Sequence, residues 1–346
     1  MKRFLFALLI VSLTVLPVSA LELTAPPVPE SGREFLPEEP ESFSEGLWEV
    51  IKAGLVILQP SFVAAARVCV GITAVMVLIS LLRAIHTQTS RIINLVAAVT
   101  IASMLLKPAN ALIHLGTQTV EELSEYGKLL LPVMTAAMAA QGGITASGAL
   151  YTGTALFDAI LTSGISKLLV PLIYAYLALA VGNAAMGEDV LKQLRDFAKW
   201  LITWGLKGTL YLFTGYIGIT GVVSGTADAV AVKAAKLAIS GVVPVVGGML
   251  SDASESVLVS ASAVKNAVGV YGMLALLAIW IGPFIQIGAQ YLFLKLTSAV
   301  STVFAGKEIA GLLQDFTSAM GLILAMVGTV CLLLLISTVC YLKGVT

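Results

Sequence analysis

The sequence predicts an all-α, polytopic integral membrane protein with roughly six to eight transmembrane helices and further interfacial amphipathic helices. Of its 346 residues, 58% are hydrophobic and only 12% are charged, and the mean hydropathy is +0.97. A soluble domain carries about twice that share of charge and could not bury so much apolar surface in one core. Several apolar runs approach the ~20 residues that span a bilayer. The formal net charge of zero gives no indication of nucleic-acid binding.

Residues 1–20 have the features of a secretory signal peptide. Lys2 and Arg3 precede a short apolar run, and small residues stand at the end of the segment, where cleavage is expected after Ala20. The alternative is an uncleaved anchor helix. Residues 21–46 are rich in proline and glutamate, which predicts an acidic, flexible, extracytoplasmic tail.

Residues 47–128 are expected to contain N-terminal helices with two membrane spans. Apolar residues recur at helical spacing over 43–58, and Pro60 is expected to end this amphipathic helix. The spans are Phe62–Leu82 and Ile92 to about Leu115. The loop between them is basic and is therefore expected in the cytoplasm, through Arg83, His86 and Arg91.

The rest of the chain divides into two predicted membrane repeats, 129–223 and 224–346. Each begins with a region rich in small residues, which let helices approach closely in lipid. The first of these regions is expected to form a tight hairpin, either as two spans or as a re-entrant pair. Each continues with an apolar span, a short charged helix at the cytoplasmic surface and a final span. In order these are 168–186, 187–199 and 200–223, then 269–294, 306–316 and 318–342.

Two sets of matched residues indicate an internal duplication. Pro132 and Pro171 have the same spacing as Pro244 and Pro283, and Asp196-Phe197 follows Gly187 at the spacing at which Asp315-Phe316 follows Gly306. The proline pairs align at an offset of 112 residues and the Asp-Phe pairs at 119, which a seven-residue insertion reconciles. Both copies begin and end on the outer face in this topology, so the predicted repeat is parallel, unlike the inverted repeats of many secondary transporters. The alternative is a chance match between residues that are common in membrane helices.

Three charged residues interrupt apolar runs: Arg67, Asp158 and Lys207. A charge inside the bilayer is costly and usually faces a protein interior or water, so these residues are candidates for a lined path or an inter-helix ion pair. The alternative is snorkelling, which suits the long side chain of Lys207 better than the short one of Asp158. Asp158 is therefore the preferred candidate.

The sequence contains no recognisable catalytic motif, and we expect the chain not to be an enzyme and to hold no cofactor or metal. Gly306-Lys307-Glu308 lacks both the hydroxyl residue after the lysine and the first glycine of a P-loop. The three cysteines all lie in apolar runs without a neighbouring histidine, so they are expected to be buried or lipid-facing side chains.

The two short charged helices are candidate docking sites for a soluble partner. Their apolar faces would lie in the bilayer interface and leave the charged faces free. The alternative is that these helices only anchor the bundle at the membrane surface. The candidate docking residues are Asp189, Lys192, Arg195, Lys199 and Lys307.

The segment from Ile239 to Ser256, together with the signal peptide and the acidic tail, resembles the stage III sporulation protein AE family of endospore-forming bacteria. Its distinctive core reads Gly241-Val242-Val243-Pro244-Val245-Val246-Gly247-Gly248. The resemblance covers the whole mature chain and implies a role in endospore formation, in the mother-cell membrane around the forespore. It also implies partners, namely the other subunits of the stage III sporulation complex and a separate cytosolic ATPase. It supplies no catalytic residues.

The function that this resemblance implies is a membrane-embedded subunit of a channel or secretion complex that links mother cell and forespore. Two alternatives stay open. An autonomous secondary transporter of small solutes would be expected to show inverted repeats and broken helices. A non-transporting membrane scaffold would be expected to tolerate polar changes in the small-residue regions.

Overall fold

The computed structural model describes residues 25–37, 42–85, 90–186, 191–242, 247–304 and 306–343, with side chains left out at 83–91 and 220–264. Within these ranges the regular elements are all helical, which confirms the all-α class. The predicted signal peptide lies outside the described residues. The elements are α2 (Glu30–Arg33), α3 (Phe43–Ile85), α4 (Ser90–Ala140), α5 (Ile144–Gly164), the π-helical turn η2 (Ile165–Leu169), α6 (Val170–Met186), α7 (Lys192–Val242), α8 (Gly247–Phe304) and α9 (Lys307–Lys343).

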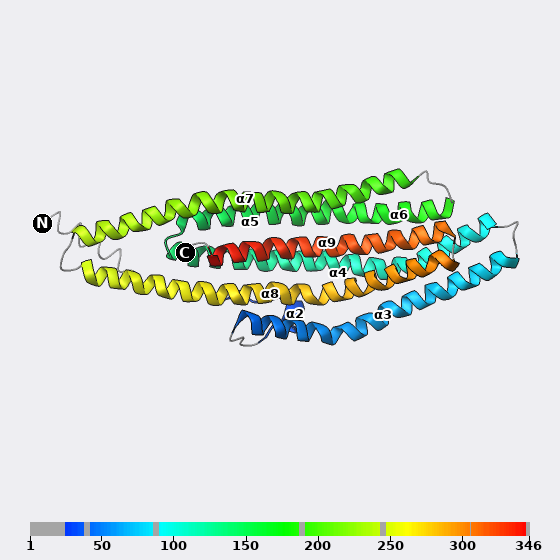
Figure 1. The fold of residues 1–346 in the computed structure, drawn as a ribbon, viewed down its shortest axis with the longest axis horizontal. Helices are drawn as coiled ribbons and strands as arrows, with labels where there is room; N and C mark the ends of the chain where they lie inside the picture. The colour runs from blue at the N-terminus through cyan, green and yellow to red at the C-terminus, as the bar shows by residue number, and fades with distance from the viewer. Residues whose placement is uncertain are drawn as a thin grey trace.

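The long helices form an elongated up-and-down bundle in which successive rods run in opposite directions (Figure 1). Helices α5, η2 and α6 join end to end into one rod. Helix α9 lies in the middle of the bundle and contacts α4, α5, α6, α7 and α8, whereas α3 and α7 lie along opposite edges of the view. The short helix α2 packs on α8, where Gly32 allows the chain to approach Ile279.

Five helical segments are long and apolar enough to cross a membrane, which supports the predicted membrane class. They are Phe43–Leu82, Ile92–Ala140, Ile144–Met186, Lys265–Phe304 and Lys307–Lys343. The 58 residues of α8 correspond to about 87 Å of helix, against about 30 Å of bilayer hydrocarbon. The rods therefore extend beyond the bilayer, so only part of each long helix can lie within the hydrocarbon.

The prediction that Pro60 ends a helix is wrong, because α3 continues through it from Phe43 to Ile85. A proline removes one backbone donor from a helix, and packing on both sides can compensate for that loss. Gly54 packs against Ile281 before Pro60, and the Phe62 ring lies edge-on to Phe293 at 5.4 Å after it. Contact with α8 on both sides thus keeps the helix continuous.

The two predicted interfacial helices are not separate elements. Over the described residues, 192–199 forms the start of α7 and 307–316 forms the start of α9. Neither sequence has a proline or glycine at the expected break, so the helical hydrogen bonds continue.

The apolar faces of these two helix starts differ. Leu194 and Phe197 on α7 are 55% and 56% exposed, whereas Ile309, Leu313 and Phe316 on α9 are fully buried in the bundle. The expectation that both apolar faces lie in the bilayer interface is therefore wrong for α9, whose apolar face packs inside the bundle.

The small-residue region 129–166 reverses direction at a single tight turn, as the predicted hairpin requires. Helix α4 ends at Ala140 and α5 begins at Ile144, with Gly142 at a φ of 93°. Only glycine adopts this left-handed region without strain. The turn therefore makes α4 and α5 antiparallel.

The helices that the proposed repeat would match run in the same direction, α6 with α8 and α7 with α9 (Figure 1). In any up-and-down bundle, helices two positions apart are parallel. The shared direction therefore does not test the duplication, and the repeat stays a prediction.

We predict opposite effects for two alanine substitutions on α5. A Cβ at Gly153 would overlap the Tyr216 ring, which is held by a 2.9 Å hydrogen bond from its hydroxyl to the Ala149 carbonyl, whereas nothing lies within 4 Å of a Cβ at Gly148. Gly153→Ala should cost about 1–3 kcal/mol of unfolding free energy through overpacking, and Gly148→Ala should be neutral or stabilising by up to ~1 kcal/mol. Thermal unfolding of the purified protein in detergent measures both, and equal effects would contradict the packing of α5 on α7.

Candidate functional site

The candidate functional site is a buried ion pair at the start of α7 and α9. The Arg195 guanidinium donates through Nη1 to Asp315 Oδ2 at 2.7 Å. The two side chains are only 13% and 10% exposed. A charge-assisted contact of this length between buried groups joins the two helices strongly and directionally.

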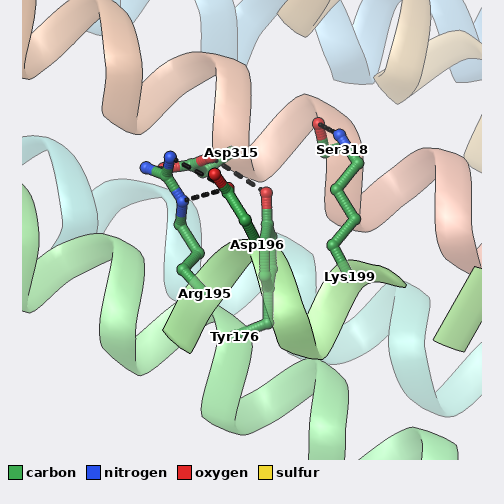
Figure 2. A network of polar contacts seen from close by, with 6 residues as sticks. All are labelled: Tyr176, Arg195, Asp196, Lys199, Asp315 and Ser318. Atoms are coloured by element: carbon green, nitrogen blue, oxygen red, sulfur yellow. Dashed lines mark hydrogen bonds and ion pairs between the residues drawn. The ribbon is translucent and has the colours of Figure 1, made fainter. Parts of the chain in front are cut away.

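Other polar side chains surround the pair (Figure 2). The Tyr176 hydroxyl of α6 donates to Asp315 Oδ1 at 2.9 Å, so both carboxylate oxygens of Asp315 are occupied. Arg195 also contacts Asp196, at 3.2 Å between Nη2 and Oδ1. One turn along α7, Lys199 Nζ donates to Ser318 Oγ of α9 at 3.0 Å. The cluster therefore ties three helices together at one level.

Each charge of the pair depends on its partner for stability, because neither is in free contact with water. Burying a single unpaired charge costs several kcal/mol, and the mutual attraction in a low-dielectric site offsets that cost only when the geometry is good. Burial by itself acts to lower the pKa of Arg195, but the carboxylates of Asp315 and Asp196 act in the opposite direction and leave that pKa above its usual value. Arg195 is therefore a permanent cation here.

A second polar seam runs through the bundle core between α4, α5 and α9. Ser124 Oγ donates to Asp158 Oδ2 at 2.6 Å, and Asp158 is only 3% exposed. Further along the seam, the hydroxyls of Thr154 and Ser337 lie 2.6 Å apart, and those of Thr135 and Tyr341 lie 2.9 Å apart. Asp158 Oδ1 has no partner among the described residues. Asp158 thus faces the protein interior, as expected of a charge placed in a span.

The other predicted site residues are distributed differently. Arg67 and Lys207 are exposed on the outer surfaces of α3 and α7, and they form no inter-helix ion pair among the described residues. Lys192, Lys199 and Lys307 are exposed near the starts of α7 and α9. Asp189 lies outside the described residues.

Arg195 requires a correction. It was expected on a free charged face, but it is turned inwards onto Asp315, because α9 places a buried carboxylate beside it. A partner protein therefore cannot use its guanidinium without breaking the pair. The three exposed lysines stay as docking candidates.

Sequence reasoning missed Asp315, Tyr176 and Ser124 as members of these polar sites. Asp315 carried a usable signal, because it is the last charged residue before the uncharged stretch 316–342. Tyr176 and Ser124 lie in ordinary apolar or polar contexts and gave no comparable signal. Within the described ranges, no group of three or more His, Cys, Asp or Glu side chains could hold a metal ion.

Comparison with known proteins identifies the family. A family model described as stage III sporulation protein AE matches residues 42–343. The chain belongs to the stage III sporulation protein AE family. The match includes every helix from α3 to α9, so the ion pair and the polar seam both lie in the family region.

A curated relative supports this family membership. Stage III sporulation protein AE of Bacillus subtilis (strain 168) is 24% identical over 254 residues, which cover 73% of this chain and 63% of that protein. The match thus spans less than two thirds of the relative's length. No solved structure matches the chain.

We predict that Asp315 and Asp196 contribute very differently to stability, although both contact Arg195. Asp315→Asn removes the charge that balances a buried guanidinium and should cost about 3 kcal/mol. Asp196 is 57% exposed, and Asp196→Asn should cost less than about 1 kcal/mol. Unfolding in detergent compares the two, and equal destabilisation would show that the α7–α9 pair does not hold the bundle.

Proposed function

We propose that the chain is a membrane-embedded subunit of a sporulation channel or secretion complex that links mother cell and forespore, and that it is required for endospore formation. Membership of a sporulation family over residues 42–343 is the observation that carries the proposal. Five helices apolar enough to cross a bilayer support a membrane location. We place the chain in the mother-cell membrane that surrounds the forespore.

In this proposal the chain is not itself an enzyme and binds no cofactor. Its partners are the other subunits of the stage III sporulation complex, including a separate cytosolic ATPase that would supply energy for transport. Lys192, Lys199 and Lys307 support a docking surface for such a partner, since they are exposed at one end of the bundle, where α7 and α9 begin (Figure 1). Charged side chains at a contact rim favour a fast, salt-sensitive association.

Co-purification tests the proposal. The full chain, tagged and supplied as the single copy in a spore-forming host, should recover the other complex subunits and the ATPase from sporulating cells. A strain without the chain should fail to form spores. Normal sporulation in that strain would end the proposal. Recovery of the chain alone, from cells that sporulate only when it is present, would instead favour an autonomous transporter or a scaffold.

Charge reversal at the helix starts gives a sharper prediction for the docking surface. Lys192→Glu with Lys307→Glu should weaken binding of the partner at least tenfold, or by ~1.4 kcal/mol, because the reversed charges repel a surface that is complementary to the lysines. Spore formation should fall as a result. The matched control is Lys52→Glu with Lys128→Glu, which changes net charge equally on exposed positions of α3 and α4. Spore counts and membrane levels of the protein measure the outcome.

Equal spore counts for the two double variants, at equal membrane levels, would contradict docking at the helix starts. In that case the exposed lysines would act only as membrane anchors. Both variants leave the Arg195–Asp315 pair intact, so a loss of spores cannot be attributed to the buried ion pair.

A further inference from the structure

Four exposed basic residues come from four different helices and lie at one level of the bundle. They are Arg67 on α3, Lys107 on α4, Lys199 on α7 and Lys295 on α8, and they are called the basic belt here. In the sequence they are widely separated, and each stands beside an apolar run. Only the packing of the helices brings them to a common level.

Contacts with α9 fix the level of Lys199 and Lys295. Lys199 Nζ donates to Ser318 Oγ at 3.0 Å, which places Lys199 beside residue 318. A Cβ at Gly321 would lie 3.4 Å from the Tyr291 ring of the antiparallel helix α8. Lys295, one turn after Tyr291, therefore lies level with residue 317.

Contacts of α4 fix the level of the other two cations. A Cβ at Gly116 would lie 2.5 Å from Ile323, so Lys107 is level with residue 314 of the parallel helix α9. A Cβ at Gly71 would lie 3.0 Å from the Met104 methyl group, which brings Arg67 beside Lys107 on the neighbouring helix. At about 1.5 Å per residue, all four cations fall within about 6 Å along the bundle axis.

The carboxylates at this level do not neutralise the basic belt. Among the described residues they are Asp196 and Asp315, which share the single positive charge of Arg195 and so leave one negative charge against the four cations of the basic belt. Lys199 bonds a neutral serine, and Lys295 Nζ lies 5.6 Å from the centre of the Tyr291 ring. Because α3 and α7 lie along opposite edges of the bundle (Figure 1), the uncompensated charge surrounds the molecule instead of forming one patch.

Amphipathic aromatic rings share this level. Trp200 is 54% exposed one residue after Lys199, and Tyr174 is 38% exposed with its hydroxyl 2.6 Å from Asn110 Oδ1 of α4. Tryptophan and tyrosine are enriched at membrane–water interfaces, where the ring meets the acyl chains and the polar tip meets headgroups. Basic and aromatic side chains at one level are therefore the expected signature of a bilayer edge.

The lengths of the uncharged stretches show on which side of the basic belt the hydrocarbon lies. On one side, α8 is uncharged over 266–294 and α9 over 316–342, and both exceed the ~20 residues that a span needs. Helices α3 and α4 do not discriminate, because charges limit them to short stretches on both sides of the basic belt, 53–66 and 68–82 in α3 and 108–120 and 92–106 in α4. The long uncharged stretches of α8 and α9 therefore place the hydrocarbon on the side of the basic belt that holds residues 316–342.

We infer that the basic belt binds the phosphate headgroups of an anionic lipid leaflet and so fixes the depth of the bundle in the membrane. Negatively charged lipids are concentrated on the cytoplasmic leaflet, and each cation near such a surface gains attraction from it. This assigns a ligand class to Arg67, Lys107 and Lys295, which the proposed docking surface does not use, and Lys199 is the one residue that both surfaces share. It also places Arg67 at the bilayer edge instead of in the membrane interior.

The full chain in lipid nanodiscs tests this inference. Spin-labelled phosphatidylglycerol and phosphatidylcholine, compared by electron spin resonance, report which lipid is preferred in the first shell around the protein. The wild-type chain should prefer phosphatidylglycerol by about fivefold, and high salt should weaken the preference. The belt variant Arg67→Gln, Lys107→Gln, Lys199→Gln and Lys295→Gln should approach equal selection of the two lipids.

A matched control removes one exposed arginine and three exposed lysines further from the basic belt, through Arg33→Gln, Lys52→Gln, Lys128→Gln and Lys343→Gln. It changes net charge equally and should keep the wild-type preference. If the quadruple belt variant does not fold, the pairs Arg67→Gln with Lys107→Gln and Lys199→Gln with Lys295→Gln should each lose part of the preference.

Two outcomes would overturn the inference. If the belt variant and the control lose the preference for phosphatidylglycerol equally, the attraction of the lipid depends on the total charge of the protein and not on where the cations lie along the bundle axis. If the wild-type chain shows no preference for phosphatidylglycerol, the basic belt does not contact lipid headgroups. The bilayer would then cover another part of the bundle, such as the distal part of the α3–α4 hairpin, or the basic belt would face an acidic protein. Failure of the sporulation role would not change either lipid measurement.

Discussion

The arrangement of the helices depends on the ion pair between Arg195 and Asp315, which balances two buried charges in a bundle that is otherwise apolar. Asp315 is followed by the uncharged stretch 316–342, and an isolated carboxylate at the head of such a helix would be strongly unfavourable. Arg195 supplies the opposite charge and Tyr176 the second hydrogen bond, so α6, α7 and α9 must meet at one relative height. Hydrophobic contact alone tolerates sliding of one helix along another, but a charge-assisted hydrogen bond does not. The ion pair therefore fixes the register that apolar packing leaves open.

The same register determines which surfaces can contact the membrane. Once α7 is fixed against α9, Lys199 lies beside Ser318, and glycine contacts such as Gly116 with Ile323 fix α4 relative to both. The exposed cations then share a level, while Asp158 and the hydroxyl seam lie well along the bundle from it. From Asp315 to Ser337 the helix rises about 33 Å, which is close to the ~30 Å of bilayer hydrocarbon. The two polar sites are thus separated by about one membrane thickness.

Composition and periodicity were sufficient to predict the all-α membrane class, the turn within 129–166 and the burial of Asp158, because each follows from local chemistry. Helix ends were predicted poorly at Pro60 and at the supposed interfacial helices. Tertiary packing on α8 and α9 continues a helix where local signals indicate a break, and the sequence alone does not reveal that packing. The role of Arg195 was missed for a similar reason. Its partner Asp315 is remote in sequence, and a charged residue in an amphipathic pattern is indistinguishable from one on a solvated face.

The two Asp-Phe pairs show how position in the bundle decides what a local sequence does. Asp196 and Phe197 are both exposed, whereas Asp315 and Phe316 are both buried, although each pair lies near the start of a helix that runs in the same direction. Helix α9 is central and must satisfy its carboxylate internally, while α7 is peripheral and can leave its carboxylate in a polar environment. If the pairs arose by duplication, only the central copy could have acquired a structural ion pair. The peripheral copy would then be free to present Phe197 and Trp200 to lipid, next to the cations that lie at the bilayer edge.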